Sequence, residues 1–172
     1  GDNIKSGNSL VDTDFYDAMI EFDGEERKIK PFNWQRAFPE IFKKGGFDAV
    51  IGNPPYVLLS PDLFQEDLIK YYRKYSVAQY KCDLYHLFYE RGLNILKKKG
   101  LLGYITPSNW MTQKFTELLR KYLLKNYKIL EIVEFDYTVF EQANVYTEII
   151  VIENSKPSVK HEIIYNIQSE SP

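Results

Sequence analysis

A short apolar run that ends in a rigid polar loop is the feature that most constrains how this chain folds. Residues 47–51 read Phe-Asp-Ala-Val-Ile, and Gly52 and the tetrapeptide Asn53-Pro54-Pro55-Tyr56 follow directly. The run predicts a buried strand that ends at the glycine. Each proline fixes its own φ and holds the residue before it extended, so the carbonyl groups of the loop have set directions. In α/β folds such a loop lies at the carboxyl edge of the sheet, where ligands bind.

This loop suits chemistry on a planar amine. The lone pair of a conjugated amine is delocalised, which makes the nitrogen a poor nucleophile. Two acceptors aimed at its N–H groups favour a more electron-rich nitrogen, and the side-chain oxygen of Asn53 and the carbonyl of Pro54 are candidates for those acceptors. Tyr56 offers an aromatic face that positions a planar group. No acid, metal or covalent nucleophile is required. The alternative interpretation is a purely structural Pro-Pro turn.

Composition limits the class of protein. The chain has 172 residues, the length of one domain, and it is 44% hydrophobic and 16% aromatic, which is enough for a sizeable core. A formal net charge of −2 argues against nonspecific nucleic-acid binding by the chain as a whole. Cys82 is the single cysteine, so the chain cannot form an internal disulfide, and a cytoplasmic location is predicted. No apolar run approaches the ~20 residues that cross a bilayer.

Strand-like and helix-like segments alternate along the chain. Apolar runs predict strands over residues 47–51, 101–106, 128–135 and 145–153, and a further strand or a linker over 159–167. Apolar residues at helical spacing predict helices over 34–42, 61–74, 83–99 and 107–126. Pro61 is expected in a first turn, Asp83 at an N-cap and Lys97–Lys99 at a helix end. The pattern predicts an α/β fold with a mostly parallel sheet and a terminal antiparallel hairpin.

The N-terminal part contains no glycine-rich nucleotide-binding turn. Residues 3–10 suggest the end of a strand and a tight turn, and the polar residues 11–31 suggest a loop, or a hairpin that turns at Asp23-Gly24. A nucleotide-binding α/β domain begins with a strand and a glycine-rich turn. We therefore expect a portion of a longer protein, with the first strands of the sheet missing. Residues 1–156 are predicted to be the C-terminal portion of a catalytic domain, and 157–172 a linker or the start of a target-recognition region.

Several segments resemble a known family. They are residues 32–56, then 83–88 (Asp-Leu-Tyr-His-Leu-Phe), 106–110 (Thr-Pro-Ser-Asn-Trp), 139–141 (Val-Phe-Glu) and the strand 147–153. With these motifs the chain resembles the DNA N6-adenine methyltransferases of type II restriction–modification systems that carry Asn-Pro-Pro-Tyr. It is similar in particular to the group in which methylase and specificity functions share one polypeptide. The resemblance implies a partial Rossmann-like fold of the S-adenosylmethionine-dependent methyltransferases.

The resemblance implies a cofactor and residues that hold it. The cofactor is S-adenosylmethionine, with Asn8 and Ser9 in a turn beside its adenine and Phe88 packed against that ring. From the residues alone, Asn8 can equally be an ordinary turn residue, and Phe88 a core residue of a helix.

The resemblance also implies a substrate. Double-stranded DNA would present one adenine, flipped out of the duplex and held between Tyr56 and Phe140. The implied catalytic residues are Asn53, Pro54, Pro55 and Tyr56. From the residues alone, Phe140 can also be a packing residue of the terminal hairpin.

The departures from the family bear on activity. The glycine-rich cofactor motif, the acidic residue that grips the ribose and the target-recognition domain are absent from this sequence. The isolated chain is therefore expected to be inactive, to bind cofactor weakly and to self-associate along an uncovered sheet edge.

Two other functions stay open. One is methylation of a protein glutamine or of guanine amines in RNA, because these substrates also need two acceptors on a planar amine. The other is a non-catalytic methylase-like scaffold that binds DNA. Cys82, His86 and His161 are expected to be structural, and no spacing indicates a metal site.

Overall fold

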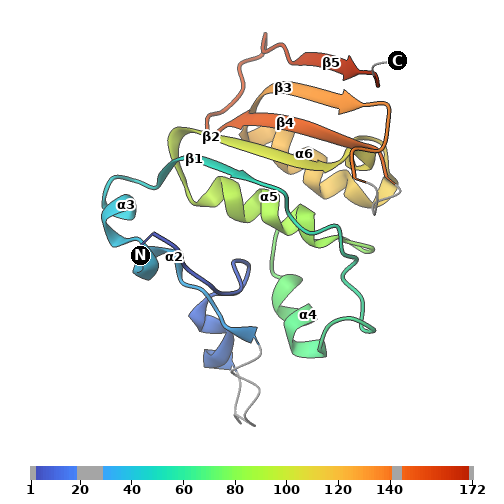
Figure 1. Cartoon of the computed structure of the whole chain (residues 1–172). Helices are drawn as coiled ribbons and strands as arrows, with labels where there is room; N and C mark the ends of the chain where they lie inside the picture. Colours follow the sequence, from blue (N-terminus) through green and yellow to red (C-terminus); the bar gives the residue numbers. More distant parts are fainter. Residues whose placement is uncertain (1–2, 19–28, 141–144, 171–172) are drawn as a thin grey trace.

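The computed structural model describes residues 3–18, 29–140 and 145–170 (Figure 1). Its strands are β1 (Phe47–Gly52), β2 (Leu96–Pro107), β3 (Lys128–Phe135), β4 (Thr147–Glu153) and β5 (Ile164–Gln168). Its α-helices are α2 (Trp34–Ala37), α3 (Pro39–Lys43), α4 (Glu66–Tyr72), α5 (Leu84–Asn94) and α6 (Glu117–Asn126). Short 3₁₀ helices are η1 (Thr13–Ala18), η2 (Ser108–Met111) and η3 (Lys114–Thr116).

The strands form one mixed sheet in the order β1-β2-β4-β3-β5. β1 pairs parallel with β2 and β5 pairs parallel with β3, whereas β4 runs antiparallel to both of its neighbours. Four strands therefore share one direction, which confirms the predicted α/β fold with a mostly parallel sheet and a β3–β4 hairpin. The last strand comes from the segment after residue 156, and the domain boundary placed there stays a prediction.

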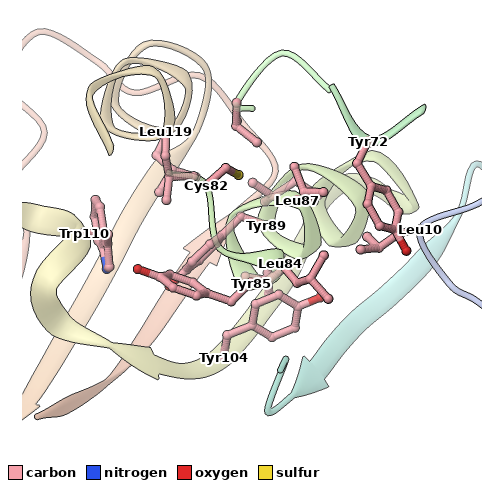
Figure 2. Close-up of a cluster of buried hydrophobic side chains, with 14 of the residues drawn as sticks. Leu10, Tyr72, Cys82, Leu84, Tyr85, Leu87, Tyr89, Tyr104, Trp110 and Leu119 are labelled. Atoms are coloured by element: carbon pink, nitrogen blue, oxygen red, sulfur yellow. The ribbon is translucent and has the colours of Figure 1, made fainter. Parts of the chain in front are cut away.

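One face of the sheet is packed against α5 and α6, which lie along the same side of it (Figure 1). Strand alternation supplies the buried side chains of this face, including Leu102 and Tyr104 of β2 and Ile150 and Ile152 of β4. On its far side α5 meets the N-terminal segment and α4, so this helix is enclosed between two layers (Figure 1). Figure 2 shows the resulting core, which runs from Leu10 and Tyr72 past α5 to Trp110 and Leu119.

Gly92 allows α5 to approach β2 closely. A Cβ atom at this position would lie 2.4 Å from the Tyr104 hydroxyl and 2.6 Å from Leu102 Cδ1. Both distances are shorter than any normal contact, so a side chain here would push the helix off the sheet. The close approach brings one side of α5 next to the end of β1.

Several predicted helix boundaries are wrong, and each has a physical reason. The helix expected over 34–42 is two short helices, because Phe38 precedes Pro39 and adopts φ −134°, outside the helical region. The helix expected over 61–74 is only Glu66–Tyr72, so Pro61 lies in a turn before it. The helix expected over 107–126 is two 3₁₀ turns followed by α6.

The end of α5 was also misplaced. The helix ends at Asn94, and Lys97–Lys99 belong to β2, where Lys99 has φ +64°. Asp83 is at the N-cap position, yet its side chain makes no capping hydrogen bond. The lysine run has no apolar periodicity of its own, and the Phe47 N–H donates to the Ile95 carbonyl at 2.9 Å, so pairing with β1 begins directly after the helix.

The N-terminal region is only partly comparable with its prediction. Residues 3–10 form no named strand, and Asn8 makes an isolated parallel bridge to Pro31. The 3₁₀ helix Thr13–Ala18 was not predicted. The hairpin expected to turn at Asp23-Gly24 lies outside the described residues. No helix within the described ranges is long and apolar enough to cross a membrane.

Candidate active site

A cavity of about 270 Å³ opens where β1 ends. The predicted catalytic residues Asn53, Pro54 and Pro55 form part of its wall. Ser9 and Phe88, which were predicted from distant parts of the chain to hold a cofactor, line the same cavity. The structure therefore brings the strand-end loop, the N-terminal turn and helix α5 together at one site.

The loop after β1 is held at both ends. On the strand side, the ladder between β1 and β2 continues as far as the pair Gly52 and Tyr104. On the other side, the Leu59 N–H donates to the Cys82 carbonyl at 2.8 Å, and the Leu84 N–H donates to the Val57 carbonyl at 2.8 Å. Pro54 is buried whereas Asn53 is exposed, and both residues line the cavity.

Asn8 fixes the N-terminal turn, but it does not line the cavity. Its Oδ1 accepts from the Leu10 N–H at 3.1 Å, and its Nδ2 donates to the Tyr72 hydroxyl at 3.0 Å. The side chain is therefore engaged by the turn and by α4, and its neighbour Ser9 reaches the cavity wall. A contact between Asn8 and a cofactor stays a prediction.

Tyr56 and Phe140 come from two separate loops and lie next to each other; a base held between them stays a prediction. Their ring centroids are 6.5 Å apart and their planes are inclined at 66°, so the rings meet edge to face and not as two parallel faces. The Tyr56 hydroxyl donates to the Ile105 carbonyl at 3.1 Å, which fixes this ring against β2. Burial raises the pKa of Tyr56 to about 12, so the hydroxyl keeps its proton for that bond at neutral pH.

A second tyrosine connects this pair to the loop after β2. Tyr85, at the start of α5, packs edge to face on Tyr56 with centroids 6.2 Å apart. Its hydroxyl donates to Asn109 Oδ1 at 3.0 Å. Asn109 belongs to the Thr-Pro-Ser-Asn-Trp motif. This motif therefore holds Tyr85, which in turn packs against Tyr56.

Sequence reasoning missed several residues of the cavity wall, among them Trp34, Arg91 and Gly92. Arg91 follows Phe88 by one helical turn, so the i,i+3 spacing could have indicated it. Trp34 lies in the segment 32–56 that carries the family resemblance, but the resemblance gives it no role. Its position next to the cavity depends on how α2 folds back, which no local pattern predicts.

Cys82 does not line the cavity. Cys82 is fully buried, and burial raises the pKa of its thiol to about 11, which keeps it protonated and unreactive. Within the described parts of the chain, no group of three His, Cys, Asp or Glu side chains could hold a metal ion.

Comparison with known proteins agrees with these motifs. The profile of the Eco57I restriction-modification methylase family matches residues 2–140. The chain belongs to this family. The match includes Asn53–Tyr56, Phe88 and Phe140, so the whole candidate site lies inside it.

Individual members of the family cover most of the chain. The type II restriction enzyme and methyltransferase RM.Eco57I of Escherichia coli is 36% identical over 151 residues, which are 84% of this chain and 14% of that enzyme. The type II methyltransferase M.BstVI of Geobacillus stearothermophilus is 38% identical over 122 residues, which are 69% of this chain and 21% of that enzyme. The chain thus spans between about a seventh and a fifth of these two relatives.

The fold also has a solved counterpart. A Listeria monocytogenes protein assigned to the class I S-adenosylmethionine-dependent methyltransferases superposes with a TM-score of 0.56 at 19% identity, covering 74% of this chain and 38% of that one. The Eco57I-family chain therefore has the α/β fold of the class I methyltransferases, as its motifs predicted.

Proposed function

We propose that the protein carrying this chain methylates the N6 atom of adenine in double-stranded DNA, with S-adenosylmethionine as donor, as part of a type II restriction–modification enzyme. One observation carries the proposal: the cavity that joins Asn53 and Pro54 with Ser9 and Phe88. At this edge of the sheet, the proposed acceptors for an amine lie beside the residues proposed to bind a cofactor. The names of the relatives, which are type II methyltransferases and a restriction enzyme, support the part of the proposal that concerns methylation in a restriction–modification system.

The residues of the cavity fit the nucleoside part of this cofactor. The cavity volume of about 270 Å³ is near the lower end of ~300–1,000 Å³ for small-molecule sites. Phe88 and Trp34 supply apolar aromatic surface, and Ser9 supplies polar groups, which is a mixture suited to a purine and a ribose. When bound, S-adenosylmethionine supplies a methyl group activated by a positively charged sulfur.

The loop after β1 prepares the amine. Asn53 Oδ1 and the Pro54 carbonyl accept its two N–H groups, which draws electron density onto the nitrogen and lets it leave the plane of the ring. Because the loop is anchored at both ends, the acceptors keep their directions without reorganising during the reaction. Tyr56, fixed by its bond to Ile105, positions the ring that carries the amine.

The aromatic pair favours a nucleobase over a glutamine amide. Tyr56 and Phe140 together present two ring surfaces beside the loop. A base flipped from a duplex needs stacking of about 1–3 kcal/mol per ring to offset the few kcal/mol of its extrusion, whereas a flexible amide gains little from such surfaces. The present edge-to-face arrangement requires a rotation of the Phe140 ring before a base can lie between the two.

Methyl-group tracing tests the proposed function. The full-length protein is incubated with methyl-labelled S-adenosylmethionine and duplex DNA, and the DNA is digested to nucleosides. We expect the label in N6-methyladenine and in no other nucleoside. Label in guanine of added RNA, or in a glutamine of added protein, would favour the first alternative. DNA binding with no label in any substrate would favour the non-catalytic scaffold.

Replacing Phe140 should weaken capture of the flipped base. Phe140→Ala and Tyr56→Ala should each lose about 1–3 kcal/mol of base stacking, whereas Phe140→Trp should be tolerated because an aromatic face remains. A 2-aminopurine at the target position measures this, because its fluorescence rises on leaving the stack. The loss should shrink when the target base is mispaired, since extrusion then costs less.

Phe135→Ala is a matched control, because Phe135 packs against Tyr137 near the same hairpin. An unchanged fluorescence rise and an unchanged rate in Phe140→Ala would make Phe140 a packing residue.

A further inference from the structure

Trp34 occupies a position that its sequence context does not explain. Its indole N–H donates to the Ser9 carbonyl at 3.1 Å, and its side chain lines the cavity beside Ser9, Phe88 and Asn53. The hydrogen bond is formed with the turn that carries the predicted cofactor residues. Trp34 is thus in contact with that turn and with the cavity at once.

The indole ring is also packed against the strand that carries the catalytic loop. Phe47, the first residue of β1, meets Trp34 edge to face with centroids 5.8 Å apart and planes inclined at 88°. Phe38 stacks on Trp34 at 6.1 Å and 27°. Phe32 also meets the indole edge to face at 5.0 Å and 80°, so three aromatic side chains hold Trp34 at the cavity wall.

The short helix α2 is held in place independently of any ligand. Asn33 caps it by accepting from the Arg36 N–H at 2.7 Å, and the Asn33 amide donates to Asp12 Oδ1 at 2.8 Å. The Phe32 N–H donates to the Val11 carbonyl at 2.7 Å. Trp34 is therefore presented to the cavity by a rigid support, which lowers the entropy cost of using it to bind a ligand.

We infer that Trp34 is a further cofactor-binding residue, which contacts the purine of S-adenosylmethionine and fixes the Ser9 carbonyl beside it. The inference rests on the proposed function, because it takes the cavity to be the cofactor site. With Phe88 on α5 and Tyr104 on β2, Trp34 is one of three aromatic residues that line the cavity from different parts of the chain. An indole and a purine are both flat and polarizable, so their contact favours a purine nucleoside over a sugar or an aliphatic ligand.

Calorimetric titration of the full-length protein with S-adenosylhomocysteine, and separately with adenosine, tests this role. Trp34→Ala should weaken both ligands by about 10- to 100-fold, as loss of one stacking contact does. Trp34→Phe keeps an aromatic ring but loses the N–H to Ser9, so about a 3- to 10-fold loss is expected. Phe42→Leu is the matched control: Phe42 packs on Phe47 at 5.9 Å in the same aromatic cluster but does not line the cavity, so its affinities should stay unchanged.

Tryptophan fluorescence gives a second readout that packing alone would not produce. Adenosine should quench part of the emission of the wild-type protein, and that part should be missing in Trp34→Phe. If the wild-type protein bound neither ligand, the proposed cofactor site itself would be wrong. If it bound both and Trp34→Phe showed wild-type affinity and wild-type quenching, only the role of Trp34 would be overturned. Trp34→Phe decides the question even if Trp34→Ala fails to fold.

Discussion

Asn53→Ala should lower the rate of methyl transfer by the full-length protein by about 10²-fold or more, because it removes one preorganised acceptor from the reacting amine. Asn53 is exposed at the cavity and is the first residue after β1. Its backbone position is fixed by the parallel ladder with β2, so alanine should leave the loop in place. The substitution would then slow the chemical step, and the affinity for S-adenosylmethionine should change little.

Single-turnover methylation of duplex DNA at saturating cofactor separates these two effects. Calorimetric titration with the cofactor gives the affinity, and the burst of labelled product gives the rate. Asn94→Ala is a matched control, since Asn94 is an exposed asparagine at the end of α5 outside this cavity. A near-normal rate in Asn53→Ala would show that the Asn53 side chain does not act on the amine.

The fold and the centre of the site could be predicted because their signals are local. A strand of five residues, a glycine and two prolines determine where the backbone stops and which way the next carbonyls point. β3 and β4 are rich in β-branched apolar residues; the structure places β3 at its predicted bounds and starts β4 two residues later than predicted. The juxtaposition of Ser9, Phe88 and Asn53 came only with the family resemblance, since no local pattern joins residues so far apart.

The features that were missed depend on packing. The lysines after α5 look like a helix end, yet the helix ends at Asn94 and pairing with β1, which begins at Leu96, gives these residues to the sheet. Trp34 reaches the cavity only because α2 folds back onto the turn at Ser9. Glu148 could have been found: strand alternation places it on the same face as Ile150 and Ile152, which is the buried one. A carboxyl group on that face is a departure from the pattern, and it has consequences for stability.

Glu148 is completely buried, and its surroundings disfavour its charge. Its Oε1 accepts from the indole N–H of Trp110, while its Oε2 has no hydrogen-bond partner among the described residues. Burial, together with the nearby charge of Glu134 across the strand pair, raises the pKa of Glu148 from 4.5 to about 8, and the bond from Trp110 only partly opposes this. The folded protein therefore holds a proton on Glu148 at neutral pH that the unfolded chain has released.

This difference sets the direction of the pH dependence. Between the unfolded pKa of 4.5 and the folded pKa of about 8, the native state binds more protons than the unfolded state, so the free energy of unfolding falls as pH rises. His86 acts in the opposite direction at lower pH: burial lowers its pKa from 6.5 to about 4, so stability rises with pH across that range. The contribution of His86 fades as pH rises past 6.5 and is the same in wild type and in a Glu148 variant, so comparing the two proteins isolates Glu148.

Glu148→Gln should remove this dependence and make the protein more stable at pH 8. Glutamine keeps an oxygen for the Trp110 indole and resembles the protonated acid, so its buried group has no proton to lose. Between pH 6.5 and 8, wild type should lose about 2 kcal/mol relative to Glu148→Gln, since each pKa unit is worth about 1.4 kcal/mol. Denaturant unfolding at several pH values measures the difference, in which contributions common to both proteins cancel.

Glu131→Gln is the control. Strand alternation places Glu131 on the opposite face of β3, so this substitution should leave the pH dependence of stability as it is in wild type. Parallel curves for wild type and Glu148→Gln above pH 6.5 would mean that Glu148 is ionised in the folded protein and that its second oxygen has a partner.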